Sequence, residues 1–214
     1  MYLCKICQAS TSLIKDSKKE LIYYRCSICG FVFLDDRYIV NEIEEKKKYD
    51  QHNNSLENEG YVQMFEDFID LSIEPYRKHI QRVLEFGSGP EPVLAELLKR
   101  RNLEVDIYDL YYSPKKVYEN KSYDLITSTE VFEHLSKPLE VLELLVEHTN
   151  KNGYIALMTK FPPKDDKEFL AWWYRRDPTH ISFFTPESFE VMAEKVGLRV
   201  LKTINKNIVV FQKV

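Results

Sequence analysis

The sequence predicts an α/β domain with a largely parallel sheet that ends in an antiparallel hairpin, preceded by a small metal-bound ribbon. Short apolar runs with strand character alternate with amphipathic helical stretches over most of the chain. A glycine-containing turn joins one of these runs to a helix. Four cysteines fall in two closely spaced pairs near the N-terminus.

Length and composition allow one main core with a small appendage, since the chain has 214 residues and is 44% hydrophobic. No stretch approaches the roughly 20 apolar residues of a membrane span, and residues 1–8 lack a secretory pattern. We therefore expect a cytoplasmic protein with no membrane partner. The net charge of -4 gives no general attraction to nucleic acid, which favours a small molecule or a protein as the binding partner.

The cysteines form two C-x2-C pairs separated by eighteen residues, the spacing of a structural four-thiolate zinc site: Cys4, Cys7, Cys26 and Cys29. Gly30 suits the left-handed position that such a turn needs, and residues 21–25 and 31–34 have strand character. A segment this small cannot bury enough apolar area to fold alone, so the metal should supply folding free energy. We predict a zinc ribbon over residues 1–37.

A connecting segment over residues 38–75 should follow. Residues 41–50 are charged and lack an apolar stripe, which predicts a solvated helix or a linker. Apolar residues then recur at helical spacing and predict a helix that docks on the main domain: Tyr61, Met64, Phe65, Phe68 and Ile69. The main domain should occupy residues 76–214.

The glycine turn follows a predicted strand over residues 82–86, and Gly87 and Gly89 allow a tight turn that a ligand can approach closely. Glu85 precedes the turn, and Asp109 ends a second strand over residues 103–108. In an open α/β sheet ligands bind beyond the carboxyl ends of the strands, where an acidic residue after the second strand can accept hydrogen bonds from ribose hydroxyls. The layout predicts a nucleoside site.

These motifs resemble the class I S-adenosylmethionine-dependent methyltransferases, especially a bacterial group with an N-terminal zinc ribbon. The resemblance spans roughly residues 76–214 and implies a Rossmann-like sheet. It implies that the cofactor lies against Glu85, Phe86, Gly87, Ser88, Gly89, Asp109, Leu110, Tyr111, Thr129 and Glu130. A dinucleotide dehydrogenase would need a further glycine where Pro92 stands.

Two features depart from the family pattern. Glu91 stands where many members have a third glycine, so the loop should contact the cofactor amino group differently or bind it weakly. Too few residues separate Asp109 from the next strand, residues 123–127, for the usual helix and third strand. We therefore expect the adenine pocket to lack its normal wall, with Leu110, Tyr111 and Tyr112 as substitutes.

The loop after the strand at residues 123–127 contains Glu130, Glu133 and His134. This arrangement resembles ubiquinone-pathway O-methyltransferases, which implies a possible divalent metal site. The alternative is that His134 is a structural histidine. The loop has no N-P-P-Y or D-P-P-Y signature and the chain has no spare cysteine, which argues against adenine-N6 and cytosine-C5 methylation.

An aromatic segment after the fifth strand should form the acceptor pocket: Trp172, Trp173, Tyr174, Arg175, Arg176 and Asp177. His180 is the predicted general base, because an imidazole titrates near neutral pH, and His134 and His52 are further candidates. The arginines would bind an anionic group. The alternative is a lid helix that only packs its aromatic residues on the core. A final helix over residues 185–195 and a hairpin over residues 198–213 complete the expected sheet.

The sequence thus predicts an enzyme that methylates an oxygen or nitrogen atom of a small metabolite. One alternative is an RNA-modifying methyltransferase that docks RNA through the ribbon. Residues 1–37 carry six basic and four acidic side chains, and four thiolates on one Zn²⁺ bring the net charge of the ribbon near zero. A neutral ribbon disfavours RNA docking, which depends on neutralising phosphates. The other alternative is a cofactor-binding scaffold without turnover.

Overall fold

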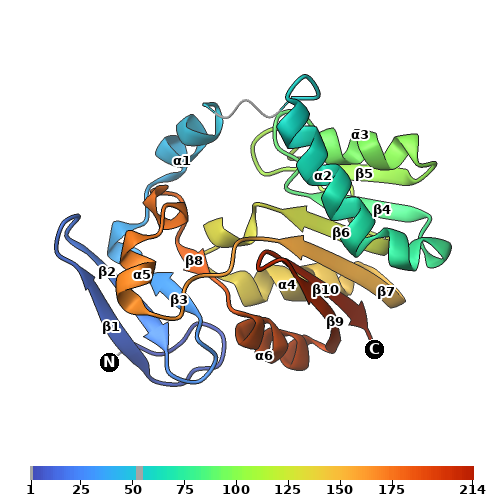
Figure 1. Cartoon of the computed structure of the whole chain (residues 1–214). Helices are drawn as coiled ribbons and strands as arrows, with labels where there is room; N and C mark the ends of the chain where they lie inside the picture. Colours follow the sequence, from blue (N-terminus) through green and yellow to red (C-terminus); the bar gives the residue numbers. More distant parts are fainter. Residues whose placement is uncertain (1, 52–54) are drawn as a thin grey trace.

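The computed structural model describes residues 2–51 and 55–214 (Figure 1). Its larger sheet has the strand order β5-β4-β6-β7-β10-β9. Strands β4 to β7 are parallel, whereas β10 pairs antiparallel with β7 and β9. The strands are β4 (Arg82–Phe86), β5 (Glu104–Tyr108), β6 (Tyr123–Thr129), β7 (Thr149–Met158), β9 (Leu198–Ile204) and β10 (Ile208–Lys213). The predicted parallel sheet with a closing hairpin is confirmed.

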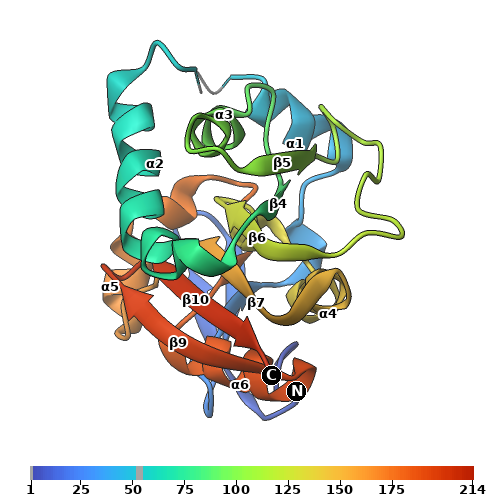
Figure 2. The same ribbon diagram turned by 90° about the vertical axis from the view of Figure 1, so that its right-hand side faces the viewer.

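Helices cover both faces of this sheet (Figure 2). Helices α2 (Glu59–Ser72) and α3 (Val93–Arg100) pack on one face, and α4 (Pro138–Glu147) and α6 (Pro186–Val196) on the other. The predicted docking of α2 is confirmed, because Phe65, Phe68 and Ile69 recur at helical spacing and are buried. Within the described residues, no helix combines the length and apolar character needed to cross a membrane.

The loop between β5 and β6 contains neither a helix nor a strand, as its length predicts. Strand β5 is therefore the edge of the sheet. Tyr118 from this loop packs against Phe86 and Tyr108 and fills part of the missing layer.

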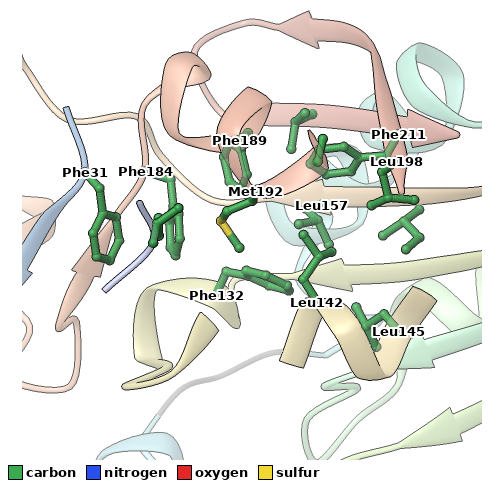
Figure 3. Close-up of a cluster of buried hydrophobic side chains, with 14 of the residues drawn as sticks. Phe31, Phe132, Leu142, Leu145, Leu157, Phe184, Phe189, Met192, Leu198 and Phe211 are labelled. Carbon is green, nitrogen blue, oxygen red and sulfur yellow. The ribbon is translucent and has the colours of Figure 1, made fainter. Parts of the chain in front are cut away.

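The cysteine-bearing segment forms a second sheet of order β1-β2-β3-β8. Strands β1 (Thr11–Asp16), β2 (Leu21–Cys26) and β3 (Val32–Leu34) come from the N-terminus, whereas β8 (Ser182–Phe183) lies after β7 in the C-terminal part of the chain. Figure 3 shows the apolar core that continues between the two sheets, where Phe31 lies beside Phe184, and Phe184 stacks on Phe189 of α6. The two sheets thus share a core, and the boundaries at residues 37 and 75 stay predictions.

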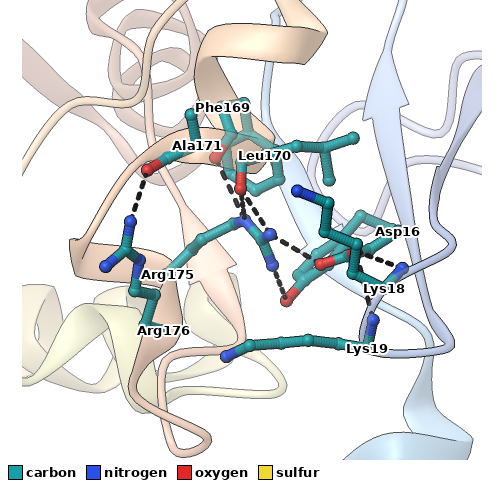
Figure 4. A network of polar contacts seen from close by, with 9 residues as sticks. Asp16, Lys18, Lys19, Phe169, Leu170, Ala171, Arg175 and Arg176 are labelled. Atoms are coloured by element: carbon teal, nitrogen blue, oxygen red, sulfur yellow. Dashed lines mark hydrogen bonds and ion pairs between the residues drawn. The ribbon is translucent and has the colours of Figure 1, made fainter.

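Arg175 ties the ribbon to helix α5 (Asp166–Ala171) and the aromatic segment (Figure 4). Its guanidinium donates to Asp16 Oδ2 at 2.6 Å and to the Tyr23 hydroxyl at 3.3 Å. It also donates to the carbonyl oxygens of Phe169 and Leu170. Both members of the Arg175 and Asp16 pair are about 95% buried, since each is 5% exposed. This pair holds the ribbon against the main domain.

The variant Arg175→Ala should lower the free energy of unfolding by about 3 to 5 kcal/mol, because it leaves Asp16 buried without its cation. Exposed Arg176, whose guanidinium donates to the Ala171 carbonyl, provides the matched control. Arg176→Ala should change the stability by about 0.5 kcal/mol or less. Urea unfolding of both variants measures the difference, and equal losses would contradict this role of Arg175.

Candidate active site

Four loops meet at the carboxyl edge of strands β4 to β7, as expected for a parallel sheet. The turn after β4 has left-handed backbone at Gly87 (φ +88°) and Gly89 (φ +68°). The backbone N–H groups of Gly87 and Ser88 donate to the Tyr108 carbonyl at the end of β5. The predicted glycine turn is therefore fastened to the neighbouring strand.

Asp109 fixes the same turn through its side chain. Its Oδ2 accepts a 2.8 Å hydrogen bond from the Gly89 N–H, and its Oδ1 accepts from the N–H groups of Tyr111 and Tyr112. These bonds occupy three of roughly four lone-pair positions of a carboxylate. Asp109 thus shapes both loops, and one acceptor position is left for a ligand hydroxyl.

Glu85 is buried below the turn, with 2% of its surface exposed. Its Oε2 accepts a 2.9 Å hydrogen bond from the Ala95 N–H in the first turn of α3. Burial raises the pKa of Glu85 to about 8. Of the other predicted cofactor residues, Phe86, Ser88 and Thr129 are buried at the strand ends, whereas Leu110 is exposed.

The variant Gly87→Ala should be destabilised and should lose ligand binding at the turn. A Cβ there would lie 2.2 Å from Val131 Cγ2, in a left-handed backbone. Gly89→Ala is the matched control, because its φ is also positive but no atom lies within 4 Å of the added Cβ. Thermal unfolding should show a larger loss for Gly87→Ala than for Gly89→Ala, and the reverse order would contradict the assignment.

The variant Glu85→Gln should gain stability relative to the parent as pH rises. The pKa of Glu85 in the folded protein is about 8, above its ordinary value of 4.5. Its contribution to stability is therefore complete below pH 4.5 and is lost as pH rises toward 8. The difference in free energy of unfolding between Glu85→Gln and the parent should increase across this pH range by no more than about 5 kcal/mol. A gap that does not change between pH 5 and pH 9 would refute the burial argument.

A second cluster faces the turn from the loop after β6 and from the aromatic segment. Glu130 has left-handed backbone (φ +53°), and Glu133 lies in a 3-10 turn, Phe132–His134. The Tyr174 hydroxyl donates to Glu133 Oε1, and it lies 3.1 Å from Glu130 Oε2. Burial, followed by the neighbouring Glu133 carboxylate, raises the pKa of Glu130 to about 8, and burial also raises the pKa of Glu133.

His134 and His180 complete the cluster, with ring centroids 4.7 Å apart. His134 Nδ1 lies 3.0 Å from the Thr179 carbonyl oxygen, and His180 Nδ1 lies 2.8 Å from that of Tyr174. One ligand atom from each of Glu133, His134 and His180 lies within 4.8 Å of the other two. The structure thus places two of the three predicted catalytic histidines together, whereas His52 lies outside the described residues.

The residues predicted to form the acceptor pocket lie in three different environments: beside the carboxyl cluster, against the ribbon, and on the surface. Tyr174 contacts the carboxylates and His180, and Asp177 forms a 3.7 Å ion pair with Lys48. Trp172 packs on Phe169 and Phe183 beside the ribbon, which matches the structural alternative. Arg175 is also directed into the ribbon, where it donates to Asp16 and Tyr23, so its guanidinium is placed for a structural role. Trp173 and Arg176 are exposed.

Helix α1 (Glu42–Tyr49) contacts both clusters, although its sequence predicts only a solvated helix or a linker. Glu45 accepts from the hydroxyls of Tyr49 and Tyr111, and the Tyr49 ring lies 5.1 Å from that of His134. Sequence reasoning missed these residues because α1 buries no residue and has no apolar stripe. The sequence feature that could have indicated a contact with the site is Tyr49, an aromatic residue at the end of an otherwise charged helix.

The four cysteines lie together, and their Sγ atoms are within 4.8 Å of one another. The Cys4 to Cys29, Cys7 to Cys26 and Cys7 to Cys29 distances are 3.7, 3.3 and 3.8 Å. Four sulfurs at about 2.3 Å from one Zn²⁺ would be about 3.8 Å apart, so the cluster is compatible with zinc. N–H groups at Ile6, Ile28 and Cys29 point at these sulfurs. The segment fits a zinc ribbon.

Solved structures with a similar fold include several methyltransferases. An O-methyltransferase family protein from Burkholderia thailandensis has a TM-score of 0.59 and 12% identity, covering 79% of this chain and 62% of its own. DesVI from Streptomyces venezuelae has a TM-score of 0.53 and 11% identity, covering 82% and 99%. The mitomycin 7-O-methyltransferase MmcR has a TM-score of 0.54 and 12% identity, covering 72% and 55%. At such identities the likeness establishes the fold.

These findings define a class I methyltransferase fold. The chain spans 62% of the length of the Burkholderia protein and 55% of that of MmcR. Its residues 45–203 match the family described as "Methyltransferase domain", and the chain belongs to that family. No curated protein matches it.

Proposed function

We propose that this chain transfers the methyl group of S-adenosylmethionine to an oxygen or nitrogen atom of a small metabolite in the cytoplasm. The observation that carries the proposal is the pairing of two structures at one sheet edge. A glycine turn held by Asp109 lies on β4 and β5, and a buried cluster of carboxylates and histidines follows β6. The first suits a nucleoside, and the second suits a reacting group that loses a proton.

Charge supports the choice of cofactor. S-adenosylmethionine carries a sulfonium and an ammonium group, and both are cations. Three carboxyl groups gather at this edge of the sheet: those of Glu85 and Asp109, which are buried, and that of Glu130, which is half-buried. A cation beside a buried carboxyl group favours its ionised form, so the cofactor's charged end should lower the raised pKa values of Glu85 and Glu130 and be stabilised at this edge.

Methyl transfer needs an in-line arrangement and little covalent help. An acceptor oxygen or nitrogen forms a bond to the methyl carbon while the carbon to sulfur bond breaks, and sulfur keeps the electron pair. The acceptor's proton passes to the cluster, where His180 is the proposed base. The Nδ1 contact of His180 with the Tyr174 carbonyl favours a proton on Nδ1, which leaves Nε2 as the accepting atom.

RNA as the acceptor has less support. Three of the six basic residues of the ribbon are engaged in ion pairs, since Lys5 pairs with Asp36, Arg25 with Asp166 and Arg37 with Asp35. Such pairs neutralise the charges that a phosphate backbone would need. Zinc at the cysteines would instead stabilise the ribbon and the parts of the site attached to it.

Addition of S-adenosylmethionine at a hundred times its dissociation constant should raise the free energy of unfolding by about 2.7 kcal/mol. Asp109→Asn should weaken binding by about tenfold or more, because the amide cannot accept at every position that the carboxylate uses. Asp106→Asn on strand β5, directly before Asp109, is the control, since Asp106 accepts hydrogen bonds from Lys121 and Tyr123 instead. Calorimetry gives both affinities.

Absence of binding by the parent chain would defeat the proposal. Binding without methyl transfer from labelled cofactor to any metabolite fraction would favour the scaffold alternative. Transfer only to RNA would favour the nucleic-acid alternative.

A further inference from the structure

Lys160 lies at the same edge of the sheet as the glycine turn, because it follows the carboxyl end of β7. Both of its neighbours in the chain are fixed to the turn between β9 and β10. The Thr159 N–H donates to the Asn207 carbonyl oxygen at 2.8 Å. The Phe161 N–H donates to the Lys206 carbonyl oxygen at 2.9 Å. The half-buried side chain of Lys160 therefore starts from a backbone that is held in place on both sides.

The Lys160 ammonium group lies next to the aromatic segment. Its Nζ atom is 5.7 Å from the centre of the Trp173 ring, which is within the range of a cation–π contact. Trp173 is 61% exposed, and its ring packs edge-on against Tyr174 with the ring centroids 5.5 Å apart. The Tyr174 hydroxyl contacts Glu130 and Glu133. Lys160 and Trp173 therefore lie at the outer rim of the carboxyl cluster.

The Lys160 charge differs from other positive charges near this rim. Among residues 2–51 and 55–214, no carboxylate forms an ion pair with Lys160. By contrast, Lys164 in the same loop pairs with Glu187 at 3.3 Å, and the Arg175 guanidinium is bound by buried Asp16. The Lys160 ammonium is therefore placed to bind an anion from outside the chain.

The Lys160 charge also acts on the cluster where the acceptor's proton is proposed to go. Burial and the neighbouring Glu133 carboxylate raise the pKa of Glu130, and the positive charge of Lys160 partly opposes this rise. Such an effect weakens with distance, so the ammonium group lies near Glu130 although the two form no direct pair. A small ligand can therefore contact Lys160 at one end while its other end faces the cluster.

We propose that Lys160 and Trp173 form a subsite for an anionic group of the acceptor, a carboxylate or a phosphate. The ammonium group donates hydrogen bonds to the oxygen atoms of the anion. The exposed Trp173 ring packs against the apolar part of the acceptor next to that anion. This inference rests on the proposed methyl transfer and narrows its small metabolite to an anionic one.

The test uses three probes with the same ring: benzoate, phenyl phosphate and the neutral benzamide. Each is titrated into the full chain with and without S-adenosylhomocysteine, and ligand-observed nuclear magnetic resonance gives the affinities. At least one anion should bind about tenfold or more tightly than benzamide, because hydrogen bonds between charged partners are stronger than neutral ones. The anion that binds more tightly identifies the group as a carboxylate or a phosphate.

The variant Lys160→Met removes the charge and keeps an unbranched side chain of similar length, so it should fold. Its affinity for the preferred anion should fall by about tenfold or more, to that of benzamide, and its benzamide affinity should not change. Lys160→Arg should retain the preference for the anion. Trp173→Ala should weaken the binding of all three probes, because packing on the ring does not depend on their charge.

Lys164→Met is the matched control, since Lys164 lies in the same loop but is paired with Glu187. Its affinities for all three probes should equal those of the parent. Thermal unfolding of each variant separates loss of the subsite from loss of the fold.

Two results would overturn the subsite. One is a parent chain that binds S-adenosylmethionine but does not prefer either anion to benzamide, and the other is a folded Lys160→Met variant with an unchanged preference. A parent chain that prefers an anion through Lys160 but does not bind S-adenosylmethionine would instead refute the proposed methyl transfer and leave the anion subsite standing.

Discussion

The backbone of Ile181 is the constraint on which the site depends. Its N–H donates to the Glu133 carbonyl, and its carbonyl accepts a 2.9 Å hydrogen bond from the Leu34 N–H of the ribbon. One extended residue thus joins the loop after β6 on one side and strand β3 on the other. Buried backbone groups need such partners, so displacement of either neighbour would leave an unpaired group. His180 precedes this residue and is positioned by it.

The ribbon is therefore part of the architecture of the site and not only an attached module. Thr185 at the start of α6 donates its hydroxyl to the Cys29 carbonyl at 2.7 Å, directly behind the second cysteine pair. Phe31 and Phe184 extend the apolar core across the junction. A segment this small gains stability when its apolar residues pack against those of the neighbouring domain. The same contacts hold the segment that carries His180 in place.

The buried carboxylates at the sheet edge are satisfied in different ways, and the difference suggests a division of roles. Asp109 accepts from three backbone N–H groups, and Glu85 accepts from the start of α3. Glu130 and Glu133 share one tyrosine hydroxyl. The first two carboxyl groups are therefore mainly structural, whereas the pKa of each member of the second pair is raised by burial. Carboxyl groups with raised pKa values in a cleft are typical of sites that bind cations or move protons.

Sequence alone determined the features that depend on local spacing. The two C-x2-C pairs, the glycine turn and the alternation of strands with amphipathic helices follow from residues close together in the chain, and the structure contains each of them. The short connection after Asp109 likewise predicts the loss of a strand, because chain length limits what a loop can contain.

Only the tertiary structure decided which distant residues meet. Strand β8 is two residues long and has no periodic pattern to reveal that it completes the ribbon. The environment of Arg175 depends on Asp16 and Tyr23, which lie far away in the sequence. An arginine at this position was therefore equally consistent with binding an anionic ligand group and with forming a structural ion pair. Glu133 and His180 are likewise close because of a hydrogen bond between distant backbone segments. The local conformational preferences of the residues do not predict such long-range pairing.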